Sequence, residues 1–504
     1  MSDAHRPRQP NSGSHGLSNR YKLFALVRGL FLLLPVAVWL WSALVAVPQG
    51  WMTAVEGRML AIVAFALVFW ILEPIPVFAT SVVIVFLQVV LVSDSALLFL
   101  RWDDAEVLAQ GQRPGPMLGK LIDYKLLLHS FAAPVIMLFL GGFFLSAGAS
   151  KYGLDRNLAR VLLKPFGVRF ETVLLGLMLI TAFFSLWMAN TPVTAMMLAI
   201  AAPVLGLFDD DDPGRVALLL GIPIASSLGG MGTPVGTPIN AIALRYLAPG
   251  HEIAFGTWML AAVPFVFLML GLSWFLLCRL FPTRLIEVRG DFAGQFDRSP
   301  RALVVYAVFA LTILLWLTTT WHGVNIYAVA LFPVAAFVAT GVITRHDMKK
   351  MSWDVLWLIA GGIALGVGLE ESGLTELFVN SVPLASLPPV LLLLAAAALG
   401  LGLSTIMSHT ATANLVMPVV MAVAAASPGL AAYGGTRILA FGVALAISLG
   451  MALPISTPCN ALAFAAGGLS NRQMLRGGGL VSVLGFVALF GLLLVLGSLW
   501  ATPP

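Results

Sequence analysis

Four short polar segments interrupt the apolar stretches of this chain. They are 185–197 (SLWMANTPVTAMM), 226–242 (SSLGGMGTPVGTPINAI), 404–418 (STIMSHTATANLVMP) and 448–464 (SLGMALPISTPCNALAF). None contains an Asp, Glu, Lys or Arg, so hydroxyls, amides and backbone groups must carry any chemistry. Helix N-termini hold anions through free N–H groups and partial positive charge, while carbonyl and hydroxyl oxygens hold Na⁺. Together the segments predict a site for a small anion beside an alkali cation.

The composition of the chain indicates that these segments lie in a membrane. Hydrophobic residues make up 60% of the 504 residues and charged residues only 10%, whereas soluble domains carry about 25% charged residues. This much apolar surface needs a lipid bilayer, in which backbone groups must be paired within helices. We therefore expect an all-α integral membrane protein. The net charge of +5 indicates no nucleic-acid partner, because the basic residues are spread over short loops between apolar runs. The two cysteines provide neither a disulfide framework nor a metal-ligand spacing.

The apolar runs predict about 11 transmembrane helices. We place them at 29–47, 54–72, 77–92, 131–150, 216–247, 258–280, 302–321, 326–342, 353–368, 437–466 and 479–500. The helices at 216–247 and 437–466 are interrupted by two of the polar segments. The stretches 171–208 and 388–426 carry the other two, and we interpret them as re-entrant hairpins that enter and leave on one side.

Positive charges set the predicted orientation. With the N-terminus in the cytoplasm, most of the 28 Lys and Arg lie on the inner side. If the two hairpins were ordinary spans, the later loops would change sides and the excess of Lys and Arg on the inner side would be smaller. We therefore expect a multi-pass protein of the inner (cytoplasmic) membrane, with its N-terminus inside and its C-terminus outside.

The chain also repeats itself. Gly141 and Gly361 lie 220 positions apart, and so do the segments 233–240 (TPVGTPIN) and 453–460 (LPISTPCN). An odd number of spans separates equivalent elements, so the two copies have opposite orientations. Inverted repeats with matching broken helices are characteristic of secondary transporters, and the breaks indicate the binding site.

This repeat gives the expected domain organisation. Residues 1–22 form a disordered cytoplasmic tail and 23–52 contain the first transmembrane helix. Repeat 1 covers 53–281, with its hairpin at 171–208 and its broken helix at 216–247. A cytoplasmic linker covers 282–301. Repeat 2 covers 302–500, with its hairpin at 388–426 and its broken helix at 437–466.

At this level of detail the sequence resembles the divalent anion:sodium symporter family of dicarboxylate, citrate and sulfate carriers. The resemblance rests on the hairpin and break segments together with LFLGGFFLSAGASKYGLDRNLA, WDVLWLIAGGIALGVGLEESGL and WILEPIPVFA. It covers nearly the whole chain beyond the tail. It implies a homodimer in which a transport domain, holding both hairpins and both broken helices, slides through the membrane as an elevator.

The resemblance also implies roles for individual residues. Substrate carboxylates would contact Asn190, Thr191, Thr237, Ser408, His409, Thr410 and Thr457. A first Na⁺ would bind near Ser185, Asn190 and the Gly236 carbonyl. A second Na⁺ would bind near Ser404, Ser408 and the Ser456 carbonyl. The substrate would be a small divalent organic anion, such as the C4-dicarboxylates succinate and malate, carried together with Na⁺.

Two departures from the family pattern affect the cation sites. Ala189 replaces a Ser at the first hairpin tip, which removes one hydroxyl. His409 replaces an Asn at the second tip. A lone His among apolar helices is usually a packed, hydrogen-bonded residue, but inside the binding motif we expect a role in substrate binding or coupling. Its imidazole could stand in for the second Na⁺.

Other functions remain as alternatives at this point. The first is a sodium-independent dicarboxylate exchanger in which His409 replaces a cation, and sulfate or citrate are further substrates to consider. An intramembrane enzyme is disfavoured, because the chain has no HExxH motif, no paired intramembrane carboxylates and no Ser/Lys or Ser/His constellation within one span. A channel is disfavoured by the closed hairpin tips. No Walker motif indicates a built-in ATPase.

Overall fold

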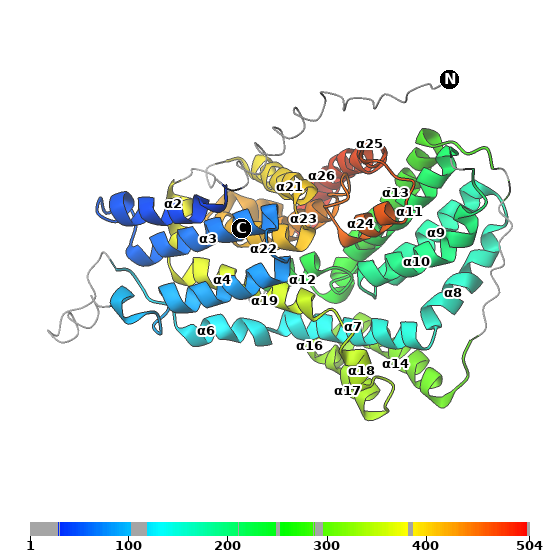
Figure 1. Ribbon diagram of the computed structural model, residues 1–504, viewed down its shortest axis with the longest axis horizontal. Helices are drawn as coiled ribbons and strands as arrows, with labels where there is room; N and C mark the ends of the chain where they lie inside the picture. The colour runs from blue at the N-terminus through cyan, green and yellow to red at the C-terminus, as the bar shows by residue number, and fades with distance from the viewer. Residues whose placement is uncertain are drawn as a thin grey trace, which may run out of the picture.

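The structure is a computed structural model that describes residues 29, 31–101, 118–209, 211–247, 252–285, 287, 296–381 and 387–500. Within these residues the regular secondary structure is helical, and extended pairing is limited to the single bridges Ser93–Ile122 and Arg169–Glu287. Figure 1 shows several of the helices running roughly along the longest axis of the molecule, while others are strongly inclined to it. The all-α prediction is therefore confirmed for the described residues. The tail at 1–22 and part of the linker at 282–301 lie outside them.

The N-terminal helices are α2 (Leu34–Trp41), continued by the π-helical η1 (Ser42–Ala46), then α3 (Ala54–Leu72) and α4 (Val77–Val92). A capping box starts α3, because Thr53 and Glu56 each accept the other's backbone N–H. Glu73 ends α3 in a left-handed conformation (φ 45°) just before Pro74. These local signals explain why α3 and α4 have the bounds expected from the sequence. A short η2 (Leu98–Leu100) follows.

The next helical segment is longer than predicted. α6 (Tyr124–His129), η3 (Ser130–Ala132) and α7 (Pro134–Lys151) follow one another almost without interruption, forming an apolar helical segment of 28 residues. Its start is fixed by Asp123, whose carboxylate accepts the Lys125 N–H at 2.8 Å. The prediction at 131–150 followed hydropathy alone and missed this cap. α8 (Leu154–Leu163) and the short η4 (Lys164–Phe166) follow after Gly153, whose φ of 64° favours glycine.

The polar segments lie between helices in both parts of the chain. In the first part these are α9 (Phe170–Ser185), α10 (Asn190–Leu205), α11 (Pro213–Met231) and α12 (Pro238–Arg245), followed by the long α13 (Phe255–Leu280). In the second part they are α21 (Pro389–Ile406), α22 (His409–Ala425), η6 (Pro428–Tyr433), α23 (Gly435–Ser448) and α24 (Pro458–Ala465), followed by α25 (Asn471–Met474), η7 (Leu475–Gly479) and α26 (Leu480–Trp500).

The remaining helices join these two groups. They are α14 (Pro300–Leu317), α15 (Thr319–His322), α16 (Ile326–Val329), α17 (Leu331–Ala339), α18 (Arg345–Met348), α19 (Trp353–Glu371) and α20 (Leu374–Ser381). The run predicted at 302–321 as one helix ends at Thr318, where the backbone departs from helical geometry (φ −103°). The run at 326–342 is likewise divided at Ala330 and ends at Ala339. Hydropathy did not reveal either interruption.

Eight described helical segments are long and apolar enough to cross a membrane, and seven shorter apolar helices accompany them. Of the hairpin arms only α21, with 18 residues, is among the eight; α9, α10 and α22 are shorter. Length alone therefore does not separate a hairpin arm from a spanning helix.

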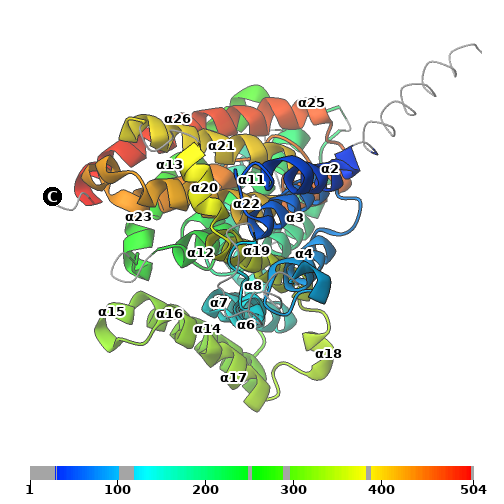
Figure 2. The same ribbon diagram turned by 90° about the vertical axis from the view of Figure 1, so that its left-hand side faces the viewer.

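Burial divides the helices into an inner and an outer set. Every residue of α11 from Val216 to Met231 is buried, as are those of α23 from Ile438 to Ser448. By contrast, only 33% of the apolar stretch is buried in α14, in α21 and in the segment Asn471–Trp500 that contains α26, which is expected of lipid-facing helices. Figure 2 shows α14, α16 and α17 as a separate layer along one side, and this layer packs mainly against α7.

Two glycines allow close helix contacts at equivalent positions. A side chain on Gly141 of α7 would collide with the Ala330 carbonyl between α16 and α17. A side chain on Gly361 of α19 would collide with Ser81 of α4. These glycines lie 220 positions apart, so the spacing seen in the sequence corresponds to a pair of similar packing contacts: α7 with α17, and α19 with α4.

Candidate functional site

Four helices begin at candidate substrate residues. Asn190 is the first residue of α10 and His409 is the first residue of α22. Thr237 and Thr457 immediately precede α12 and α24, whose first helical residue is a proline in both cases. Proline favours this position because its fixed φ suits a helix start and its missing N–H needs no partner. Each of the predicted polar segments therefore presents a helix N-terminus, which attracts negative charge.

The first tip is held together by hydroxyl and carbonyl groups. The Ser185 Oγ lies 2.7 Å from both Asn190 Oδ1 and the Ser226 carbonyl oxygen. The Ser226 hydroxyl donates to the Asn190 carbonyl at 3.0 Å. Gly236 lies directly against the Ser185 carbonyl, because an added side chain would come within 2.8 Å of that oxygen. The three residues predicted for the first cation, Ser185, Asn190 and Gly236, thus lie close together.

The loop after α11 is held by Asn240, a residue that sequence reasoning did not single out. Its Nδ2 donates to the carbonyls of Gly230, Met231 and Thr233 at 2.8–3.3 Å. In the second part of the chain, Asn460 Nδ2 donates to the carbonyls of Met451 and Leu453 at 3.1 and 2.9 Å. Asn240 and Asn460 lie 220 positions apart in the quoted motifs, so the repeat itself contained the signal that identifies them.

The second tip differs from the first at His409. His409 is 8% exposed, and its Nε2 lies 2.7 Å from the Gly450 carbonyl oxygen. Because a carbonyl can only accept, Nε2 carries a proton and donates it. Ser404 is fully buried and lies against Gly450 as well, since an added side chain there would collide with the Ser404 hydroxyl. The imidazole therefore binds a carbonyl oxygen beside a predicted cation ligand.

The other residues predicted for the second cation are only partly brought together. The Ser456 hydroxyl donates to the Thr405 carbonyl at 2.8 Å, next to Ser404 in the chain. Ser404 itself donates to the Leu401 carbonyl at 3.0 Å. The Ser408 hydroxyl instead caps its own helix by accepting the Ala411 N–H at 3.3 Å. The structure thus places Ser404 and Ser456 near each other, while the Ser408 hydroxyl is engaged locally.

Four predicted substrate threonines have hydroxyl protons that no hydrogen bond to a described protein group uses. Within the described residues, the side-chain hydroxyls of Thr237 and Thr410 make no hydrogen bond to protein groups, although Thr237 is only 3% exposed. Thr191, at the first tip, is exposed. The Thr457 hydroxyl accepts the Asn460 N–H at 3.0 Å and retains its proton for donation. These hydroxyls can therefore donate to an anion.

The two parts of the chain meet across these tips. α24 packs against α10 and α11, and α12 packs against α22 and α23. Near the start of α24, the thiol of Cys459 lies beside the hydroxyls of Thr194, Ser226 and Thr191. Hydropathy and spacing could not show this crossing, which brings the second break of the chain next to the first hairpin tip. Polar groups from both parts therefore share one buried region.

Sequence and structural comparisons indicate related proteins. The family described as the sodium:sulfate symporter transmembrane region matches residues 27–503. The sodium-dependent dicarboxylate transporter SdcS of Staphylococcus aureus is 27% identical over 456 residues, covering 82% of this chain and 81% of SdcS. An uncharacterised transporter of Schizosaccharomyces pombe is 29% identical over 415 residues, which cover 80% of this chain but only 44% of that protein.

Two solved structures have a similar fold. The YdaH transporter of Alcanivorax borkumensis gives a TM-score of 0.51 at 16% identity, covering 76% of this chain and 89% of YdaH. MtrF of Neisseria gonorrhoeae gives a TM-score of 0.55 at 11% identity, covering 86% of this chain and 97% of MtrF. At such identities the likeness concerns the fold alone. The match over residues 27–503, by contrast, spans nearly the whole sequence, and the chain belongs to the sodium:sulfate symporter transmembrane family.

Proposed function

We propose that this protein is a secondary active transporter of small divalent organic anions, with C4-dicarboxylates such as succinate and malate as substrates. The observation that carries the proposal is the set of four helix N-termini that begin at hydroxyl- and amide-bearing residues. A dianion can be bound there by N–H and O–H donors without a buried cationic side chain. The relationship to SdcS, a sodium-dependent dicarboxylate transporter, supports this class of substrate.

The two carboxylates of the substrate would bind between the two tips. Asn190 and Thr191 would contact one carboxylate, and Ser408, His409 and Thr410 the other. The hydroxyls of Thr237 and Thr457 would complete the site from the two broken helices. Helix N-termini favour a negative charge by about 0.3–1 kcal/mol each at the surface, and by up to about 2 kcal/mol where they are partly buried.

Na⁺ symport is the form of coupling we propose first. The first ion would bind the oxygens around Ser185, Asn190 and Gly236, which lie within contact of one another. The second would bind near Ser404, Ser408 and Ser456. Carbonyl and hydroxyl oxygens of unwound helices are the usual ligands of coupling Na⁺ in secondary transporters.

A second candidate function is dicarboxylate exchange without sodium, and the contact of His409 favours it. The Nε2–H group binds the Gly450 carbonyl at 2.7 Å, which satisfies an oxygen that would otherwise be available to an ion. A fixed N–H donor cannot leave with the substrate. Transport would then proceed as an exchange of one dicarboxylate for another, with no ion gradient driving net uptake.

We further propose that the protein works as a homodimeric elevator in the inner membrane, with its N-terminus in the cytoplasm and its C-terminus outside. The packing partners support inverted repeats: α12 packs against α22 and α23 as α24 packs against α10 and α11. In this interpretation α9–α10 and α21–α22 are the re-entrant hairpins. Together with α11–α12 and α23–α24 they form the transport domain, which slides as a rigid body.

Ligand binding to the purified protein tests the substrate class. Succinate should raise the thermal midpoint of the wild type, which is measured both in the presence and in the absence of Na⁺. Sulfate and citrate are tested in the same way as competing substrates. Thr237→Val and Thr457→Val should each weaken succinate binding about 10- to 150-fold, because one hydrogen bond to a charged group is worth about 1.5–3 kcal/mol. Stabilisation by sulfate or citrate but not by succinate would refute the dicarboxylate assignment.

A further inference from the structure

A cavity of about 400 Å³ lies between α7, the segment after α18 and the first hairpin tip. Its walls include Ser146 and Lys151 of α7, Lys350 from the segment between α18 and α19, and Pro192 near the start of α10. Pro192 follows Thr191, a proposed substrate residue, and both are exposed. The cavity therefore runs from loops that we assign to the cytoplasmic side to the edge of the proposed binding site.

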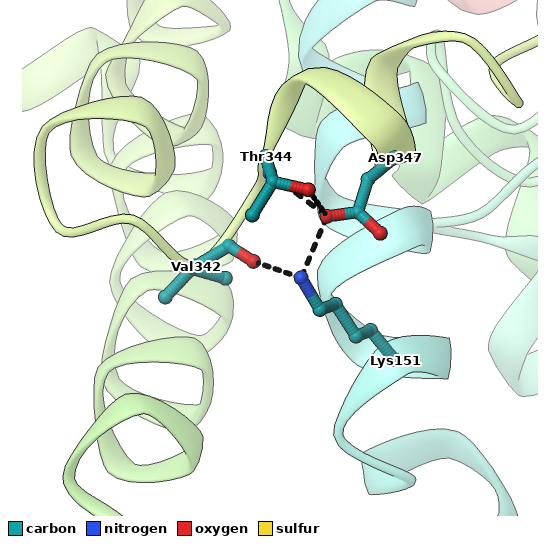
Figure 3. Close-up of polar contacts among 4 residues, drawn as sticks. All are labelled: Lys151, Val342, Thr344 and Asp347. Atoms are coloured by element: carbon teal, nitrogen blue, oxygen red, sulfur yellow. Dashed lines mark hydrogen bonds and ion pairs between the residues drawn. The ribbon is translucent and has the colours of Figure 1, made fainter.

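One wall of this cavity is fixed by an ion pair, drawn in Figure 3. The Lys151 ammonium donates to Asp347 Oδ2 at 2.6 Å and to the Val342 carbonyl at 2.8 Å. The same Asp347 oxygen accepts the backbone N–H and the hydroxyl of Thr344 at 2.8 and 2.7 Å. The positive charge of Lys151 is thus neutralised, and the end of α7 is attached to the segment around α18.

Lys350 lies three residues beyond Asp347 on the same wall, and its situation is different. It is exposed, and its ammonium has no hydrogen-bond or ion-pair partner among the described residues. Among the described residues that line the cavity, Asp347 has the only carboxylate, and it already binds Lys151. The cavity therefore carries one uncompensated positive charge, whereas the neighbouring Lys349 is exposed but does not line it.

We propose that this cavity is the path by which a dicarboxylate reaches the binding site from the side of α18, and that Lys350 attracts the anion into it. The inference rests on the proposed function, because it needs an anionic substrate. A positive charge at the mouth of a low-dielectric cleft raises the local concentration of anions, and dissolved salt screens the effect beyond about 8 Å at physiological ionic strength. Lys350 would act before binding, as a residue that steers the substrate.

Sided transport measurements on Lys350→Ala and Lys350→Arg test this role. In proteoliposomes, labelled succinate is varied on one face at a time while unlabelled succinate saturates the other. At low ionic strength, Lys350→Ala should raise KM on the α18 face about three- to tenfold and leave kcat and the opposite face unchanged. Lys350→Arg should behave as the wild type, and high salt should remove most of the difference.

Lys349→Ala is the matched control, since it removes the same charge from an adjacent position outside the cavity. It should leave KM unchanged. An equal rise of KM in Lys349→Ala and Lys350→Ala would overturn the inference in favour of a general surface potential. So would an unchanged KM in Lys350→Ala. If the wild type transports no succinate, the proposed function is wrong and the inference about Lys350 is wrong with it. If the wild type transports succinate but Lys350→Ala has an unchanged KM, only the inference about Lys350 is wrong.

Discussion

His409→Asn tests whether the imidazole occupies the place of a cation. The wild-type Nε2–H donates to the Gly450 carbonyl at 2.7 Å in a buried position. A shorter side chain that fails to reach this carbonyl leaves it unpaired, which costs about 1–3 kcal/mol. If the vacated space then binds Na⁺, an ion concentration of about ten times its Kd returns about 1.4 kcal/mol. The variant should therefore be destabilised without sodium and largely recovered by it.

The assay is the thermal midpoint of purified protein in sodium and in choline chloride at equal ionic strength, followed by succinate uptake in the same two salts. The variant should show a larger sodium response than the wild type in both measurements. Trp258→Phe is a matched control, because the Trp258 Nε1 donates to the Met231 carbonyl at the other break at 2.9 Å. This control should lose stability without gaining a sodium response. A destabilised His409→Asn variant with the wild-type sodium response would refute the reasoning.

Three further predictions follow from other contacts. Ser185→Ala removes the hydroxyl next to Asn190 at the proposed first cation site, so the sodium concentration for half-maximal uptake should rise about 5- to 150-fold; an unchanged value in sodium titrations would exclude Ser185 as a ligand. Asn240→Ala leaves at least two buried carbonyls unpaired, and Asn460→Ala leaves one buried and one partly buried carbonyl unpaired, so each should lower stability by about 2 kcal/mol or more in thermal unfolding, with transport slowed; two unaltered midpoints would contradict the bracing role. Burial alone would raise the pKa of Asp347, but hydrogen bonds from Lys151 and Thr344 outweigh it and hold that pKa well below its ordinary value. The stability from this contact is therefore complete above the ordinary Asp pKa of about 4, and it is lost only as the pH falls through the lowered value. Between pH 5 and 8, uptake and the thermal midpoint should therefore depend on pH in the same way in Asp347→Asn and in the wild type.

Local sequence signals explain the parts of the fold that could be predicted. Pro238 and Pro458 favour the first turn of a helix, and their repetition in the chain identified the two breaks. The absence of charged residues from the four polar segments indicated anion binding by backbone and hydroxyl groups. Family membership, expected from these motifs, was confirmed by the match over residues 27–503.

Features that depend on packing between distant segments could not be predicted. Ser226 contacts both Ser185 and Asn190 across 41 and 36 residues of sequence, and no local pattern indicates that pairing. The direction of His409 depends on the position of Gly450, 41 residues away. Helix ends defined by backbone geometry, such as the interruption at Thr318, were missed because hydropathy continues through them.

Succinate uptake into proteoliposomes tests the central claim most directly. One set of vesicles receives an inward sodium gradient, and the other is loaded with unlabelled succinate in the absence of sodium. We expect labelled succinate to accumulate in at least one set. Uptake that needs the gradient establishes symport, whereas uptake that needs only internal succinate establishes exchange, for which His409 is the proposed replacement of the ion. No succinate uptake in either set, with protein that is folded and correctly inserted, would contradict the assignment as a dicarboxylate transporter.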